Sequence, residues 1–149
     1  MTSFLIDINV WLAMTWDQHP QHASAAQWYG STEAEALWFC RFTMLGFLRL
    51  LTNTQVMGGS VVTIAGALDL YDEWRQDPRI ELAPEPPGIE PLLRRALAKF
   101  NAQVATKAIA DSYLVAFAEA AGAHLVTFDR GLAHAGRSRR LPVTLLKPQ

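Results

Sequence analysis

The stretch FLIDINVWLA, residues 4–13, decides the fold, because it joins a short apolar run to a helix pattern through one carboxylate. The run that ends before Asp7 is too short for a helix and is typical of a buried strand, whereas a helix pattern begins at Asn9. A similar run, HLVTF at residues 124–128, ends at Asp129. A charge directly behind an apolar strand needs a reason, so both junctions are candidate functional positions.

Strand and helix patterns alternate along the rest of the chain. Apolar runs predict further strands at residues 37–40, 80–83 and 142–146. Helical spacing predicts helices at residues 20–29, 44–51 with Thr43 as N-cap, 63–76, from 91 onward, and from Asp111 to the stop at Gly122. Because strands and helices alternate, we expect an α/β fold whose parallel sheet is covered by helices on both faces.

Composition favours one globular domain over residues 1–149. Half of the 149 residues are hydrophobic, 18% are charged, and the net charge is -1, which argues against a disordered or polycationic chain. A single cysteine excludes an internal disulfide and a cysteine-rich zinc site. The first residues lack the pattern of a signal peptide, and no apolar stretch reaches the length of a membrane span. We therefore expect a cytoplasmic protein with no membrane partner.

Three acids are expected to meet at one edge of the sheet. In a parallel sheet, strand C-termini and the following helix N-termini face the same edge, where ligands bind. Asp7 and Asp129 follow predicted strands, and Asp111 begins a predicted helix. Asn9, two residues after Asp7, is expected at the same edge. Crowded carboxylates require a cation, and oxygen ligands favour Mg²⁺ or Mn²⁺. Such an ion activates water for cleavage of a phosphodiester.

Each acid also has a simpler explanation. Asp111 could be an ordinary helix N-cap, and Asp129 before Arg130 is a common turn sequence. Asp7 is harder to explain in structural terms. Taken together, three acids on one predicted edge favour a metal-dependent site over three independent structural roles.

Four blocks of sequence extend this interpretation. They are LIDINVWLA (residues 5–13), TMLGFLRLLTN (43–53), ADSYLVAFA (110–118) and LVTFDRG (125–131). In this order and spacing the chain resembles the PIN-domain family, specifically the VapC-type ribonuclease toxins of bacterial toxin–antitoxin pairs. The resemblance implies a three-layer α/β/α sandwich with a five-stranded parallel sheet, a homodimer, and a Mg²⁺- or Mn²⁺-dependent endoribonuclease. It also implies an antitoxin protein that occupies the site.

The resemblance assigns roles to individual residues. It implies that Asp7, Asp111 and Asp129 are catalytic metal ligands, that Asn9 orients the first acid by hydrogen bonds, and that Thr127 supplies a hydroxyl near the last acid. The chain departs from the family at Met44, where a glutamate is usual. A thioether is a poor ligand for Mg²⁺, and Thr43 offers an oxygen nearby without a charge.

Basic residues form the expected contact with RNA phosphates. The run Arg137-Ser138-Arg139-Arg140 follows the strand that carries Asp129, and we expect it beside the acids together with Arg130. Arg49 and Lys107 are further candidates. For all of them, a solvated loop or a helix-surface ion pair is the simpler alternative. The substrate implied is single-stranded or loop RNA, because bases must be unstacked to be read.

Two other hypotheses remain open from sequence. The first is a PIN-like protein that binds RNA or antitoxin without turnover because Met44 replaces the glutamate. The second is a phosphoacceptor α/β domain of the receiver or haloacid-dehalogenase kind, which requires paired acids where this chain has Asp7 and Asn9. Helices near residues 20–30 and 63–76 are the candidates for dimer and antitoxin contacts.

Overall fold

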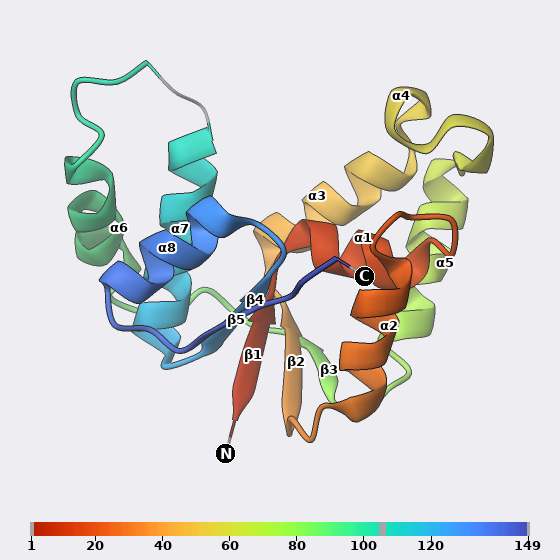
Figure 1. Ribbon diagram of the computed structural model, residues 1–149, viewed down its shortest axis with the longest axis horizontal. Coiled ribbons are helices and arrows are strands. Elements are labelled where there is room, and N and C mark those ends of the chain that lie inside the picture. Colours follow the sequence, from red (N-terminus) through yellow and green to blue (C-terminus); the bar gives the residue numbers. More distant parts are fainter. Residues whose placement is uncertain (1, 105–106, 149) are drawn as a thin grey trace.

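The computed structural model describes residues 2–104 and 107–148, and a parallel five-stranded sheet is its centre. The strand order is β3-β2-β1-β4-β5, with every neighbouring pair parallel (Figure 1). The strands are β1 (Ser3–Ile6), β2 (Ala36–Phe39), β3 (Ile80–Leu82), β4 (His124–Thr127) and β5 (Val143–Leu145). Each overlaps a strand expected from an apolar run, so the predicted α/β class and parallel sheet are confirmed.

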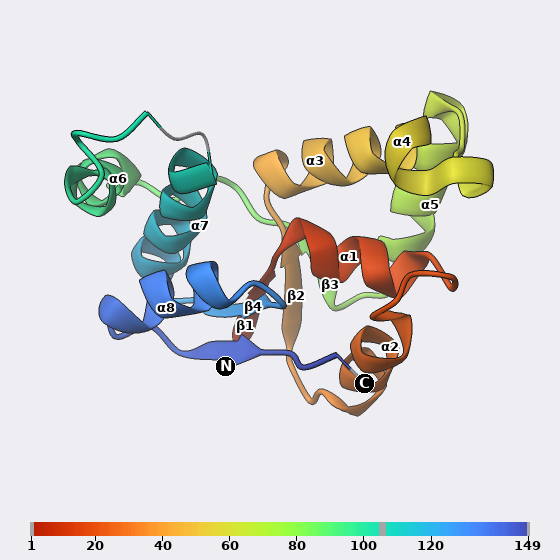
Figure 2. The same cartoon turned by 45° about the horizontal axis from the view of Figure 1, so that its top comes forward.

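Helices cover both faces of the sheet (Figures 1 and 2). One side holds α1 (Ile8–Thr15), α2 (His22–Ser31), α3 (Arg41–Leu51), α4 (Thr54–Met57), a 3₁₀ turn η1 (Gly58–Ser60) and α5 (Ile64–Trp74). The other side holds α6 (Ile89–Ala98), α7 (Lys107–Ala121) and α8 (Arg130–Ser138). The expected three-layer α/β/α arrangement is therefore confirmed. Among the described residues, no helix has the length and apolar character needed to cross a bilayer.

Alternate residues of the central strands enter two separate cores. Leu5 packs with the residues of α7, whereas Ile6 packs with those of α1 and α3. Successive side chains of a strand point to opposite faces, and both faces are covered here. This explains why Phe4–Ile6 of β1, all of β2, and Leu125 and Val126 of β4 are apolar without interruption. In the core on the α1 side, the Trp11 ring stacks on Phe39 with centroids 3.8 Å apart.

The start of α3 differs from the prediction. The helix begins at Arg41, with Cys40 as N-cap, so Thr43 is its third residue and not the N-cap expected from sequence. The Thr43 hydroxyl is buried, accepts a hydrogen bond from the Cys40 amide at 2.9 Å and donates one to the Cys40 carbonyl at 3.1 Å. Thr43 thus closes a capping box from inside the helix.

Two further boundaries change the positions of the acids. Helix α7 includes Lys107, so Asp111 lies in its second turn, and the expectation that Asp111 opens the helix is wrong. Residues 130–138, read from sequence as a turn and loop, form α8 instead, with Asp129 as N-cap. The simple capping explanation is thereby removed for Asp111 and established for Asp129.

Candidate active site

Asp7 is held at the carboxyl end of the central strand by two hydrogen bonds. Its Oδ1 accepts from the Ile8 amide at 2.8 Å, and its Oδ2 accepts from the Thr127 hydroxyl at 2.8 Å. Burial raises the pKa of Asp7, while these two bonds oppose the increase. The carboxylate is therefore fixed in place at an electrostatic cost, which a nearby cation would offset.

Thr127 links the two strands that carry acids. Its buried hydroxyl donates to Asp7 and accepts from the Asp129 amide at 2.9 Å. Strands β1 and β4 are direct neighbours, paired with Ile6 opposite Val126. Asp7 and Asp129 therefore leave the sheet side by side, as the topological argument from sequence required.

Asp129 is bound by the first turn of α8 and by a lysine. Its Oδ1 accepts from the amides of Gly131 at 2.7 Å and Leu132 at 3.2 Å, and its Oδ2 forms an ion pair with Lys107 Nζ. Burial tends to raise the pKa of Asp129, but the Lys107 contact and the α8 amides together lower it below its usual value. Asp129 is the acid most firmly kept ionised.

Asp111 is the acid without a partner. It is partly buried, and among the described residues no group donates a hydrogen bond to its carboxylate. Burial, and next the charge of Asp129, raise the pKa of Asp111 to about 6, while Lys107 opposes this and Asp7 adds to it. Asp111 lies one helical turn after Lys107 on α7, and Lys107 pairs with Asp129, which Thr127 links to Asp7, so the three acids lie in the same region.

The donor chemistry of this region suits a hard divalent cation, but the side chains are not arranged as a finished site. Within residues 2–104 and 107–148, no three Asp, Glu, His or Cys side chains lie close enough to hold a metal ion as they stand. Like charges repel, and the Lys107 ammonium takes one oxygen of Asp129. An ion bound at the three aspartates would have to displace the Lys107 ammonium from Asp129.

Two supporting residues do not have the roles expected from sequence. Asn9 is exposed, and in the described structure its side chain makes no hydrogen bond to Asp7, which Thr127 holds instead. Thr43 is buried and uses its hydroxyl on the Cys40 backbone, so it offers no oxygen to the acids. Thr127 is the hydroxyl that reaches the site.

The expected basic run lies away from the acids. Arg137, Arg139 and Arg140 are at the C-terminal end of α8, whereas Asp129 caps its N-terminus, so the prediction that they lie beside the acids is wrong. A helix of nine residues separates the two ends by roughly 13 Å. Arg139 instead pairs with Glu119 at 2.8 Å and ties α8 to α7. Sequence analysis misplaced these arginines because it did not predict a helix over residues 130–138.

Other cations are placed differently. Arg130 is exposed at the first residue of α8 and therefore on the acidic edge, whereas Arg49 is exposed in the last turn of α3, away from it. Sequence reasoning missed Arg41, the first residue of α3. Its guanidinium donates to the Met44 sulfur at 3.4 Å. The position of Arg41 just after β2 could have identified it, because the carboxyl end of β2 faces the same sheet edge as Asp7 and Asp129.

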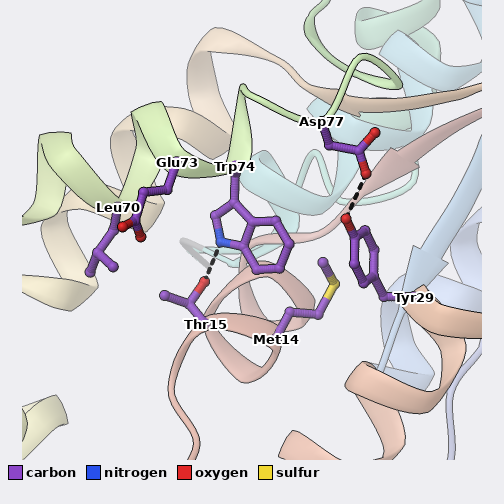
Figure 3. Close-up of a pocket in the computed structure, with 7 residues that line it drawn as sticks. All are labelled: Met14, Thr15, Tyr29, Leu70, Glu73, Trp74 and Asp77. Atoms are coloured by element: carbon purple, nitrogen blue, oxygen red, sulfur yellow. Dashed lines mark hydrogen bonds between the residues drawn. The ribbon is translucent and has the colours of Figure 1, made fainter.

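A cavity of about 290 Å³ lies among α1, α2 and α5 (Figure 3), and none of Asp7, Asp111 and Asp129 lines it. Most of its polar groups are already paired: the Tyr29 hydroxyl donates to Asp77 at 2.6 Å, and Trp74 Nε1 donates to the Thr15 hydroxyl at 2.8 Å. Asp77 also forms an ion pair with Arg79 at 2.9 Å. This network joins helices and leaves few groups for a ligand.

Comparison with known proteins decides the family. The model of the PIN domain matches residues 4–138, which is most of the chain. The chain belongs to the PIN-domain family. A relative of this PIN domain, the ribonuclease VapC41 of Mycobacterium tuberculosis, is 37% identical over 137 residues, covering 89% of this chain and 92% of the relative.

Solved structures agree on the fold of the PIN domain. The crystal structure of Mycobacterium tuberculosis VapC20, a toxin that cleaves the sarcin-ricin loop, aligns with a TM-score of 0.67 at 15% identity and covers 90% of this chain and 95% of that one. A VapBC2 chain from Rickettsia felis, in a complex bound to a promoter DNA fragment, aligns with a TM-score of 0.66 at 9% identity. The alignment covers 98% of this chain and 100% of that one.

Met44 is where this PIN domain departs from the glutamate that the family resemblance leads us to expect. The side chain is partly buried against the core on the α1 side, and its sulfur receives the Arg41 guanidinium. The position at which the resemblance leads us to expect a carboxylate therefore holds an apolar group beside a cation.

Proposed function

We propose that this PIN domain is a divalent-metal-dependent endoribonuclease, the toxin of a toxin–antitoxin pair, that cleaves single-stranded or loop RNA. The observation that carries the proposal is that Asp7 and Asp129 lie side by side at one sheet edge, linked through Thr127, with Asp111 on the neighbouring helix α7, whose Lys107 pairs with Asp129. The relative that is 37% identical is named a ribonuclease. A phosphoacceptor domain is not favoured, because residue 9 is an asparagine and supplies no second acid beside Asp7.

The three aspartates would hold Mg²⁺ or Mn²⁺, which on binding supplies a Lewis acid and lowers the pKa of a water molecule. Thr127 fixes the orientation of Asp7, and the first amides of α8 fix Asp129. Lys107 neutralises part of the acidic cluster while no ion is bound. These contacts set the geometry of the carboxylates before substrate arrives.

Phosphate contacts are proposed for cations at the acidic edge. Arg130 and Lys107 lie there, and both have exposed side chains. Because each neutralised phosphate releases counterions, affinity for RNA should fall as salt increases. Arg49, Arg137 and Arg140 are exposed at other places on the fold and would contact only a longer RNA. Arg139 is engaged with Glu119.

Partners are proposed from the family and from exposed apolar side chains. Leu45 on α3 and Ile64 and Leu68 on α5 are 56%, 72% and 40% exposed. One of the structural neighbours was solved as a toxin–antitoxin complex on promoter DNA. We propose a homodimer and a cognate antitoxin in the cytoplasm, with the α5 region, one of the two helices expected from sequence, in a protein contact.

RNA cleavage by the purified protein tests the proposal. We expect cleavage with Mn²⁺ or Mg²⁺, loss of cleavage with a chelator, and a rate at least 100-fold lower in Asp7→Asn and Asp129→Asn. Asp72→Asn, an exposed acid on α5, is the matched control and should retain full activity. Cleavage that persists in both site variants would point to a contaminating nuclease and reject the assignment.

A second candidate, a PIN domain that binds RNA or antitoxin without turnover, rests on Met44. The variant Met44→Glu distinguishes the two candidates. If the natural chain is inactive and Met44→Glu creates metal-dependent cleavage, the natural protein is a binding protein. A new carboxylate there would lie beside Arg41, so the double variant Met44→Glu with Arg41→Gln separates the effect of the acid from its neutralisation.

A further inference from the structure

A cavity of about 520 Å³ opens between α6, α7 and α8, directly beside the acids. Pockets for small ligands occupy roughly 300–1,000 Å³, so this volume accommodates one nucleotide. Asp111 and Lys107, which belong to the candidate active site, also line this cavity. A substrate group in the cavity would therefore be continuous with a phosphodiester at the aspartates.

The walls of the cavity combine an aromatic ring with small side chains. Phe100 is partly exposed after the end of α6, and Ala108 and Ala135 face the same space from α7 and α8. Gly131 lies on the side next to Asp129, where an added Cβ would be 3.1 Å from the Asp129 carboxylate. The space is therefore bounded by an apolar surface that suits the flat face of a base.

Exposed polar groups surround the opening. His134 and Gln103 offer hydrogen-bond donors and acceptors, and Lys99 supplies a second cation besides Lys107. Lys99 Nζ lies 3.3 Å from the Ser138 hydroxyl, an exposed contact that leaves donors for another acceptor. An aromatic face, base-edge partners and two ammonium groups together match a base that carries phosphates.

We propose that this cavity binds the base of an unpaired nucleotide next to the cleaved phosphodiester, with Phe100 as the stacking surface and Lys99 on the flanking phosphate. The proposal rests on the proposed ribonuclease function and adds a specificity-determining pocket to it. Base stacking on an aromatic ring contributes about 1–3 kcal/mol, and RNA-binding proteins take up bases that are splayed out of helices. His134 and Gln103 are then the residues that distinguish one base from another.

Binding measured without cleavage tests this pocket. The full chain is titrated in EDTA with a fluorescent single-stranded oligoribonucleotide, so that the result does not depend on turnover. We expect Phe100→Ala to weaken binding about 10-fold and Phe100→Tyr, which keeps the ring, to restore it. Ala135→Leu, which fills the cavity from α8, should weaken binding similarly while the folded far-UV spectrum is retained.

Two matched variants locate the effect. Phe42 carries an exposed ring on α3 outside the cavity, so Phe42→Ala should leave affinity unchanged. Lys99→Met should reduce the slope of log affinity against log salt by about 1. A 4-thiouridine in the oligonucleotide should cross-link to Phe100 or His134 on irradiation.

The proposal is overturned if Phe100→Ala and Ala135→Leu bind the oligonucleotide as tightly as the natural chain does. It is also overturned if the cross-link maps elsewhere. The same holds if these substitutions weaken the binding of an antitoxin peptide and leave the binding of the oligonucleotide unchanged. An absence of RNA cleavage with intact, Phe100-dependent binding would reject the ribonuclease function and leave the nucleotide pocket standing.

Discussion

Asp111 is ionised at neutral pH in a position that opposes its charge. It lacks a hydrogen-bond donor among the described residues, and burial and the charge of Asp129 raise its pKa to about 6. The ordinary value is 3.8, so the folded protein holds this proton more tightly than the unfolded chain does. Ionised Asp111 therefore lowers the free energy of unfolding above pH 6, and the penalty disappears as the pH falls from 6 toward 4.

We predict that Asp111→Asn raises the free energy of unfolding by about 1–2 kcal/mol at pH 8 in EDTA, after allowance for solvent screening, and by little at pH 4.5. Urea unfolding at both pH values measures this difference. Asp72→Asn, on the exposed face of α5, serves as the control and should show no such pH dependence. Equal stabilisation of Asp111→Asn at the two pH values would contradict the assigned cause.

At the scale of the element, α8 is a helix that local sequence patterns did not predict. Its residues RGLAHAGRS include two glycines, and Asp129-Arg130-Gly131 is a common turn sequence, which is why sequence reasoning interpreted the segment as turn and loop. The helix forms because Asp129 caps it and because Leu132, Ala133 and Gly136 are buried against the sheet. The strands, by contrast, were predictable from local apolar runs alone.

Gly136 marks the closest approach of α8 to the sheet, and we predict that Gly136→Val destabilises the protein by about 2 kcal/mol. An added Cβ would lie 2.9 Å from Val143 Cγ2 and 3.1 Å from Leu125 Cδ1, both on strands that have little room to move. Thermal unfolding measures the loss.

The control for this prediction is Gly30→Ala in α2. No atom lies within 4 Å of a Cβ added at Gly30, so this substitution should stabilise the protein slightly through helix propensity. Equal effects of the two substitutions would show that the close packing of α8 against the sheet does not matter.

At the scale of the whole molecule, the sheet and one of the helices that cover it contribute different parts of the candidate site. The carboxyl ends of β1 and β4 supply Asp7, Thr127 and Asp129, whereas α7 supplies Asp111 and Lys107. The chain is nearly neutral overall, with a net charge of -1, so the acidic edge is a local feature that composition does not reveal. If a divalent ion binds at this edge as proposed, Lys107 competes with it for Asp129.

We predict that Lys107→Met binds Mn²⁺ about tenfold more tightly than the natural chain, because a positive charge is removed from beside the ion. Isothermal titration measures this affinity, and saturating Mn²⁺ should also raise the melting temperature. Lys99→Met removes a charge of the same sign whose ammonium contacts Ser138 and not the acids in the described structure, and it should change Mn²⁺ affinity much less. Weaker Mn²⁺ binding by Lys107→Met would show that the lysine supports the ion.

The amino-acid sequence by itself determined the strands, the parallel sheet and the edge that carries Asp7 and Asp129, because short apolar runs and the polar residues behind them are local signals. It also identified Thr127. Only the tertiary structure decided that Thr127, 120 residues away, holds Asp7 where the nearby Asn9 does not. It likewise paired Lys107 with Asp129 and Arg139 with Glu119. Such partners depend on how α7 and α8 pack against the sheet, and spacing along the chain does not encode distances between side chains on different elements.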